Sequence, residues 1–93
     1  MRYEWDEEKR TQSRLKHGVD FVIVETFAWS TALVVVDDRE DYDELREIAV
    51  GFIGVGLYVM AFTMRADDLV RVIMLRKATR AEARRYAEAQ EQE

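Results

Sequence analysis

Residues 57–77 read LYVMAFTMRADDLVRVIMLRK, and this stretch decides the fold. Leu57 to Arg65 and Leu69 to Lys77 are two apolar runs of strand length. Ala66-Asp67-Asp68 lies between them and has the length and side chains of a tight turn. We therefore predict that the two runs pair as an antiparallel hairpin.

Regular structure is expected on both sides of this hairpin. After it, Thr79-Arg80-Ala81-Glu82 has the spacing of a capping box, which predicts the start of a terminal helix rich in Ala, Glu and Arg. Before it, strands are expected at Thr31 to Val36 and at about Arg46 to Ile53, with a charged loop between them. Gly54-Val55-Gly56 marks a tight connection into the hairpin.

The first thirty residues predict a strand and at least one helix. Arg2 to Trp5 reads as a short strand, and Asp6 can cap a helix that ends at His17, because Gly18 suits the left-handed conformation that stops helices. Asp20 to Trp29 is ambiguous, since it combines strand propensity with apolar residues at helical spacing. The order of elements predicts an α+β fold with an antiparallel sheet of about four to five strands covered by helices.

Composition restricts the class of protein. Ninety-three residues suit one domain, 1–93, and 48% hydrophobic residues suit a packed core. The chain has no cysteine and one histidine, which leaves no apparent metal site, and no phosphate-binding glycine motif or cofactor signature is present. No stretch approaches the length of a membrane span or a secretion signal, so we expect a cytoplasmic protein.

Charge is distributed unevenly along the chain. The net charge is −5, which argues against nucleic-acid binding through general basicity, but residues 65–85 carry 7 basic and 3 acidic residues. Acidic residues gather instead between 37 and 47. A basic face for a polyanion and an acidic segment for a cationic partner are therefore both expected.

His17 is the most pointed candidate for chemistry. It is the only histidine, follows Lys16 at a predicted helix end, and can transfer a proton near neutral pH. The alternative is that it only donates hydrogen bonds to carbonyls at the end of its own helix.

Arginines on the predicted hairpin and helix can bind phosphate. Arg65, Arg71 and Arg76 lie on the two strands, whereas Arg80, Arg84 and Arg85 lie on the helix. Strict alternation places Arg71 in a row with Ile73 and Leu75, and Arg76 in a row with Val70, Val72 and Met74. Pairing of these arginines with carboxylates is as compatible with the spacing as ligand binding is.

Two further side chains have structural explanations. Glu44 and Arg46 face the same side if the strand has begun, so they form a candidate ion pair as readily as a catalytic pair. Tyr86 belongs to the inward stripe of the terminal helix, which predicts a core position, although its hydroxyl can still reach a polar site.

Taken in order, these residues resemble the BrnT family of toxins along nearly the whole chain. The resemblance rests on the following residues: Tyr3-Glu4-Trp5-Asp6, Lys9, Lys16-His17-Gly18, Asp20-Phe21, Glu44-Leu45-Arg46, Gly51, Thr63-Met64-Arg65, Arg71-Val72-Ile73, Arg76-Lys77-Ala78-Thr79, Glu82 and Tyr86. It implies a RelE-like fold with two N-terminal helices, an antiparallel sheet and a last helix, so that residues 20–29 are helical.

The resemblance also implies a function. It implies a ribonuclease that needs no metal or cofactor, inhibits translation, and is neutralised by a BrnA-like ribbon-helix-helix antitoxin, through which alone it meets operator DNA. The site residues expected on this basis are His17, Lys16, Arg65, Arg71 and Arg76 for catalysis and Arg80, Lys77 and Arg46 for RNA binding.

The sequence departs from the pattern of many BrnT relatives at Ser13, Glu40-Asp41 and Met74, where polar or basic residues are replaced or acid is added. These departures motivate a second hypothesis, a catalytically silent binding module that pairs with a DNA-binding antitoxin and tunes repression of its operon. In that case the acidic segment from 37 to 47 would dock a basic antitoxin surface.

Overall fold

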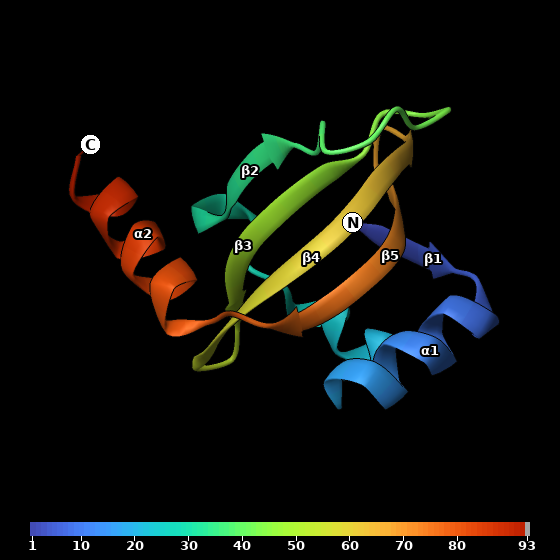
Figure 1. The fold of residues 1–93 in the computed structure, drawn as a ribbon, viewed down its shortest axis with the longest axis horizontal. Coiled ribbons are helices and arrows are strands. Elements are labelled where there is room, and N and C mark those ends of the chain that lie inside the picture. Colours follow the sequence, from blue (N-terminus) through green and yellow to red (C-terminus); the bar gives the residue numbers. More distant parts are fainter. Residues whose placement is uncertain (93) are drawn as a thin grey trace.

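The computed structural model describes residues 1–92 and shows an α+β arrangement around a five-stranded sheet (Figure 1). The strands are β1 (Arg2–Trp5), β2 (Leu33–Val36), β3 (Glu47–Ile53), β4 (Gly56–Ala66) and β5 (Leu69–Lys77), in the spatial order β1-β5-β4-β3-β2. The helices are α1 (Glu7–His17) and α2 (Arg80–Glu91), with 3₁₀ segments η1 (Phe21–Thr26) and η2 (Trp29–Thr31). In residues 1–92, no helix has both the length and the apolar character needed to cross a bilayer.

The predicted hairpin is confirmed, because β4 and β5 pair antiparallel from Ala66 opposite Leu69 to Tyr58 opposite Lys77. The sheet as a whole is mixed, however, since β1 pairs with β5 in parallel. The prediction of an antiparallel sheet is therefore wrong at this edge. It assumed short connections between successive strands, whereas α1, η1 and η2 separate β1 from β2 and carry the chain to the opposite edge.

Both α-helices begin where their capping residues predict, and α1 also ends where Gly18 predicts. Asp6 accepts a hydrogen bond from the Glu8 backbone amide at 2.8 Å and starts α1, and Gly18, with φ of 73°, ends it. Thr79 and Glu82 form the predicted capping box of α2, with each side chain accepting from the other residue's amide, at 3.1 and 2.8 Å.

The helix expected over 20–29 is present only as the short 3₁₀ segment η1, which covers residues 21–26 and is followed by η2 at 29–31. Asp20 starts η1 by accepting from the Val22 amide at 3.2 Å. Phe21 and Val24 are both completely buried, and three-residue spacing matches the three residues per turn of a 3₁₀ helix. The β-branched residues of this stretch also disfavour an α-helix.

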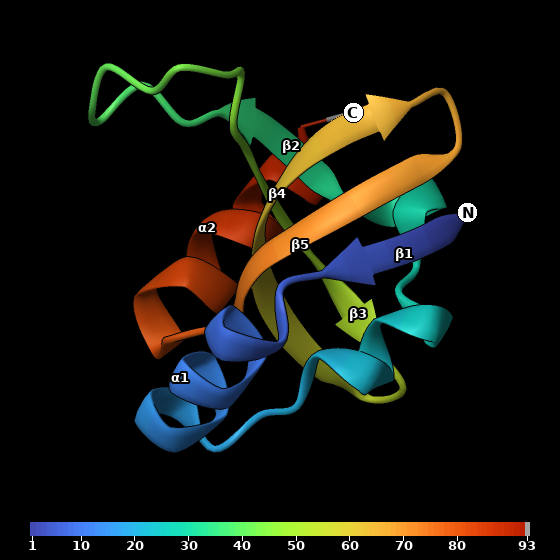
Figure 2. The same cartoon turned by 90° about the vertical axis from the view of Figure 1, so that its right-hand side faces the viewer.

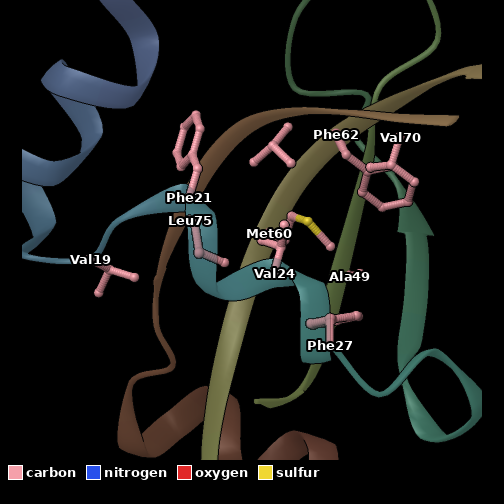
Figure 3. Packing of buried hydrophobic residues seen from close by; sticks show 10 residues of the cluster. Val19, Phe21, Val24, Phe27, Ala49, Met60, Phe62, Val70 and Leu75 are labelled. Carbon is pink, nitrogen blue, oxygen red and sulfur yellow. The ribbon is translucent and has the colours of Figure 1, made fainter. Parts of the chain in front are cut away.

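The core lies on one face of the sheet. Figure 3 shows η1 residues Phe21 and Val24 packed over Met60 and Leu75 of the hairpin strands. Figure 2 shows η1 on one side of the sheet and α2, together with the segment joining β2 to β3, on the other. The face of the sheet opposite the core is therefore covered by α2 and by the segment that joins β2 to β3.

An irregularity in β5 decides which of its side chains reach that second face. Ala61 pairs with Met74, and Phe62 pairs with Val72, so Ile73 has no partner across the hairpin. As a result, Val72 and Leu75 both lie in the core although they are three residues apart.

This shift corrects the rows that strict alternation predicted. Val70, Val72 and Leu75 share the core face, whereas Arg71 and Arg76 both lie on the opposite face, across from Thr63 and Val59 of β4. The predicted rows are wrong beyond Val72, because a bulge reverses the parity of every later side chain.

Candidate active site

A cleft of about 550 Å³ lies on the sheet face opposite the core. Its apolar floor is formed by Ile48, Val50, Val59 and Ala61 of β3 and β4. Its walls come from the end of α1, the end of β5, the first turns of α2 and the segment 37–46. The polar side chains that line it are Lys16, His17, Asp37, Arg39, Tyr42, Arg46, Arg76, Glu82, Arg85 and Tyr86.

The cleft is electropositive although the chain is acidic. Its lining contains five lysine or arginine side chains and two carboxylates, which gives a net charge of +3 when His17 is neutral. Walls of one prevailing sign over an apolar floor concentrate counter-ions in the space between them. The arrangement suits an extended polyanion or a phosphate group.

His17 is positioned in the cleft by helix α1 and by Ser13 one turn earlier. The buried Ser13 hydroxyl accepts from the Leu75 amide at 3.4 Å and donates to the Leu75 carbonyl at 3.3 Å. Leu75 lies on β5 beyond the last residue paired with β1, so Ser13 takes the place of a strand partner there. These two hydrogen bonds attach the last turns of α1 to β5 at Leu75, the residue before Arg76.

The environment of His17 favours its neutral form. Partial burial lowers the pKa of the His17 imidazole below 6.5, and the positive charges of Lys16 and then Arg76 lower it further. At neutral pH the imidazole is therefore available to accept a proton. The backbone amide of Gly18, which donates to the Arg14 carbonyl at 2.7 Å, already closes the helix end.

Arg76 is held from across the cleft by the first turn of α2. Its Nη1 and Nη2 donate to the two carboxylate oxygens of Glu82 at 2.7 and 2.8 Å. The hydrogen bonds from Arg76 lower the pKa of Glu82 to about 2, and the same interaction raises the pKa of Arg76. Because Glu82 also caps α2, one carboxylate joins this helix to the end of β5.

Arg46 differs from Arg76 in its surroundings. Its guanidinium carbon lies 4.1 Å from the centroid of the Tyr42 ring, a cation–π geometry. Its Nε is buried and has no hydrogen-bond partner in residues 1–92. The candidate ion pair between Glu44 and Arg46 is not formed. Glu44 pairs with Arg65 instead, with 3.7 Å between Glu44 Oε2 and Arg65 Nη1. A buried donor without a partner carries an energetic cost.

The structure brings together only part of the predicted set. Lys16, His17, Arg46 and Arg76 line one cleft. Arg65 is paired with Glu44, and Arg71 is hydrogen-bonded to Glu4 of β1; neither is among the lining residues.

Lys77 and Arg80 line a separate hollow beside the Gly56 turn. It lies on the connection between β5 and α2, next to the cleft along the chain but not part of its lining. These two residues are therefore adjacent to the predicted site without belonging to it.

Several lining residues were missed by sequence reasoning. Asp37, Arg39 and Tyr42 belong to a stretch that the sequence pattern predicts to be one acidic surface, and Arg85 is one of several arginines on the predicted helix. A basic residue and an aromatic residue inside an acidic run were the signal available for this segment. Tyr86 is 7% exposed, as predicted for a core position, and its hydroxyl donates to the Thr31 carbonyl at 2.7 Å.

With this geometry in place, comparison with known proteins identifies the class. Residues 5–82 match the family model described as the ribonuclease toxin BrnT of type II toxin–antitoxin systems. The fold is similar to the crystal structure of the Brucella abortus ribonuclease toxin BrnT, with a TM-score of 0.66 and 29% sequence identity, over 86% of this chain and 99% of that one. Comparison with curated proteins gave no match.

The fold and the match together define a small α+β toxin of the ribonuclease class. The chain belongs to the BrnT family of type II toxin–antitoxin systems. The resemblance found in the sequence is thus confirmed, and the matched residues include all those that line the cleft except Arg85 and Tyr86.

Proposed function

We propose that this protein cleaves cytoplasmic RNA without a metal ion or cofactor, in the manner of RelE-like toxins, and thereby inhibits translation. The observation that carries the proposal is the cleft itself. The only imidazole of the chain lines this cleft together with arginine side chains from three separate segments. RNA contains its own nucleophile, the ribose 2′-hydroxyl, so such a protein has to supply proton transfer, alignment and charge stabilisation.

In this mechanism His17 is the general base. Its lowered pKa keeps it neutral, so it can take the proton of the 2′-hydroxyl as that oxygen attacks the adjacent phosphorus. The bond from phosphorus to the 5′-oxygen breaks, and this oxygen takes a proton from solvent. The products are a 2′,3′-cyclic phosphate and a free 5′-hydroxyl.

Arg76 and Arg46 are assigned to the phosphate. Arg76 lies near enough to His17 to affect its pKa, so it is placed to stabilise charge on the phosphate that His17 helps to attack. Arg46 lines the cleft and offers its guanidinium charge to the phosphate, and Lys16 assists electrostatically. Arg65 and Arg71 leave the catalytic set because carboxylates hold them outside the cleft, while Lys77 and Arg80 are assigned to flanking nucleotides.

The direct test is incubation of purified protein with RNA in the presence of a chelator. We expect cleavage by the wild type, 2′,3′-cyclic phosphate ends, and a loss of about 10²–10⁴-fold in rate for His17→Ala, the range that general acid–base catalysis contributes. The Thr11→Ala variant, altered at an exposed position of the same helix, is the matched control. Intact RNA from wild type, or equal cutting by His17→Ala, would contradict the assignment.

The antitoxin partner implied by the family is proposed to be a BrnA-like ribbon-helix-helix protein that brings the complex to operator DNA. Strand β2 is one of the two outer strands of the sheet, and Val35 and Val36 are 55% and 57% exposed. The exposed acids Asp38, Glu40 and Asp41 follow it directly. An apolar edge next to a negative patch suits a partner segment with apolar and basic residues.

Substitution of the exposed acids tests this contact. Neutralising Asp38, Glu40 and Asp41 together is expected to weaken binding of a basic antitoxin at low salt and to reduce its salt dependence. Asp37 is left unchanged because its side chain is 2% exposed and is turned toward Arg39. Undiminished binding would show that the partner docks elsewhere.

A catalytically silent binding module remains the second candidate, and one observation favours it. Arg76 is already neutralised by Glu82, so part of the positive charge of the cleft is satisfied internally. Under this hypothesis the protein binds its antitoxin and modulates operator binding but leaves RNA intact. The cleavage assay separates the two functions, because only the nuclease yields cyclic phosphate ends.

A further inference from the structure

The segment 37–46, which joins β2 to β3, contributes one wall of the cleft. The Asp37 backbone amide donates to the Arg46 carbonyl at 2.8 Å, which draws the two ends of the segment together. Figure 2 shows the segment projecting beyond the sheet on the side that carries α2. From it, Asp37, Arg39, Tyr42 and Arg46 line the cleft.

Asp37 organises this wall from a buried position. Its carboxylate, 2% exposed, accepts from Arg39 Nε at 2.7 Å and Arg39 Nη2 at 2.9 Å. It also accepts from the Arg39 amide at 3.3 Å and from the Tyr42 hydroxyl at 3.3 Å. A bidentate fork of this kind fixes the plane of the guanidinium and leaves Nη1 directed elsewhere.

Arg39 and Arg76 have corresponding arrangements on the two sides of the cleft. Each guanidinium is held in a fork by one carboxylate, Asp37 for the first and Glu82 for the second. The side chain of Arg39 is 67% exposed, so its remaining donors are accessible. Arg39 and Arg76 line the same cleft, and the positive charge of Arg39 partly opposes the rise in the Arg76 pKa that Glu82 produces. An anion placed between them would reduce the repulsion between the two charges.

We propose that Arg39 is a phosphate-binding residue presented by Asp37, and that Arg39 and Arg76 clamp one RNA phosphate between opposite walls of the cleft. The inference rests on the proposed function only for the identity of the ligand, RNA, and does not require cleavage. Tyr42 is a positioning residue, because its hydroxyl binds Asp37 and its ring lies against Arg46.

The clamp is tested by binding of a fluorescent 2′-O-methyl oligoribonucleotide, which cannot be cut because it lacks the 2′-hydroxyl. The logarithm of affinity is measured against the logarithm of salt concentration for wild type, Arg39→Ala and Arg76→Ala. Each variant is expected to weaken binding and to flatten the slope by about 0.7, the value for one lost phosphate contact on a single strand.

Arg2→Ala is the matched control. Arg2 is held by Asp68 in the same fork, at 3.1 and 2.8 Å, with a side chain 65% exposed, and it does not line the cleft. Its loss removes the same charge, so we expect affinity and slope close to wild type. If Arg39→Ala behaves like Arg2→Ala while Arg76→Ala weakens binding, the clamp is wrong.

The role of Asp37 is tested with Asp37→Asn, which keeps the charge of Arg39 but removes the fork. We expect KM for cleavable RNA to rise several-fold with a smaller change in kcat, and a salt slope closer to wild type than that of Arg39→Ala. An unchanged KM would contradict the presenting role. Should this buried substitution unfold the protein, Tyr42→Phe removes only the hydroxyl bond to Asp37 and should raise KM in the same direction.

The outcomes for the clamp and for the nuclease are distinguishable. Wild type that binds the oligonucleotide with the expected slopes but does not cut RNA supports the clamp and refutes the nuclease. Cutting of RNA with an unchanged slope in Arg39→Ala supports the nuclease and refutes the clamp. No binding of the oligonucleotide by wild type refutes the clamp.

Discussion

Arg71 and Arg76 lie on the same strand and the same face of the sheet, and each is bound by a glutamate. Their surroundings differ. Arg71 is bonded to Glu4 of the neighbouring strand β1, so its ion pair joins two strands that are already hydrogen-bonded. Arg76 is bonded to Glu82 of α2, so its ion pair bridges from the sheet to a helix and leaves a hollow between them.

The difference lies in the element that carries the partner of each arginine, a strand for Arg71 and a helix for Arg76. A partner on an adjacent strand keeps the guanidinium close to the sheet at its edge. A partner on a helix that lies over the sheet directs it into the space beneath the helix, where Lys16 and His17 from α1 also point. The end of β5 near Lys77 therefore lies along the cleft to which the proposed function is assigned, and the end near Leu69 lies outside it.

Replacing Arg71 and Arg76 one at a time tests this contrast. The loss of activity expected for the Arg76 variant is the largest effect that the contrast predicts. Arg76→Ala should lower kcat/KM for RNA by about 10²–10³-fold, the cost of removing one donor that stabilises developing charge. Arg71→Ala should leave kcat/KM nearly unchanged and destabilise the fold by less than about 1 kcal/mol, because partly exposed ion pairs contribute little. Steady-state kinetics and thermal unfolding measure the two quantities.

Equal losses of activity in the two variants would remove the distinction between the two ends of the strand. A larger loss in Arg71→Ala than in Arg76→Ala would reverse it. Arg76→Lys serves as an additional comparison, since lysine keeps the charge but not the bidentate fork and should restore only part of the activity.

Replacing Ser13 is expected to have a smaller effect, because Ser13 joins helix α1 to the end of β5 that lies along the cleft. Ser13→Ala removes both hydrogen bonds to Leu75 and leaves those buried backbone groups without this partner, at an expected cost of about 1–3 kcal/mol in the free energy of unfolding. We also expect activity to fall by about tenfold, since the position of His17 depends on α1 and a shift of 1 Å can cost about 10²-fold.

Chemical denaturation and kinetics on the same preparation check both parts of this prediction. Thr11→Ala, at an exposed position of the same helix, should change neither. A stable and fully active Ser13→Ala variant would mean that this contact does not position the helix. The hydroxyl would then be replaceable by simple packing.

The pKa of His17 gives the smallest expected effect and sharpens the electrostatic part of the comparison. Because His17 is the only histidine, its imidazole signal in an NMR titration is unambiguous. We expect a pKa below 6.5 in the folded protein, raised by Lys16→Gln and raised less by Arg76→Gln. Arg71→Gln should not change it.

The sign of the corresponding stability effect follows from linkage. The unfolded chain, with its ordinary histidine pKa of 6.5, takes up the proton at a higher pH than the folded protein does. The contribution of His17 to the free energy of unfolding is therefore fully present above pH 6.5. It is lost as the pH falls through the lower pKa that His17 has in the folded protein. A folded pKa at or above 6.5, or one insensitive to Lys16, would contradict this electrostatic description.

Much of the fold was predictable, because caps and turns act locally. Asp6, Gly18 and the capping box from Thr79 fix the helix boundaries through contacts within a few residues, and the hairpin follows from its turn. The parallel pairing of β1 and the bulge at Ile73 depend on contacts between distant segments, which no local pattern records.

The cleft was predictable only in part for the same reason. His17, Lys16, Arg46 and Arg76 were expected, whereas the partners that decide between structure and function were not. Glu82 was expected as a helix cap and also binds Arg76. Asp37 was counted as surface acid and instead holds Arg39 from a buried position, because burial depends on how the segment folds back on the sheet.

One measurement tests directly whether RNA lies in this cleft. Labelled protein is titrated with the 2′-O-methyl oligonucleotide while the His17 imidazole and the arginine Nε–H signals are followed by NMR. We expect the signals of His17, Arg39, Arg46 and Arg76 to move together, and those of Arg65 and Arg71 to stay in place. Movement of the Arg65 and Arg71 signals with the cleft residues unaffected would contradict the proposed site.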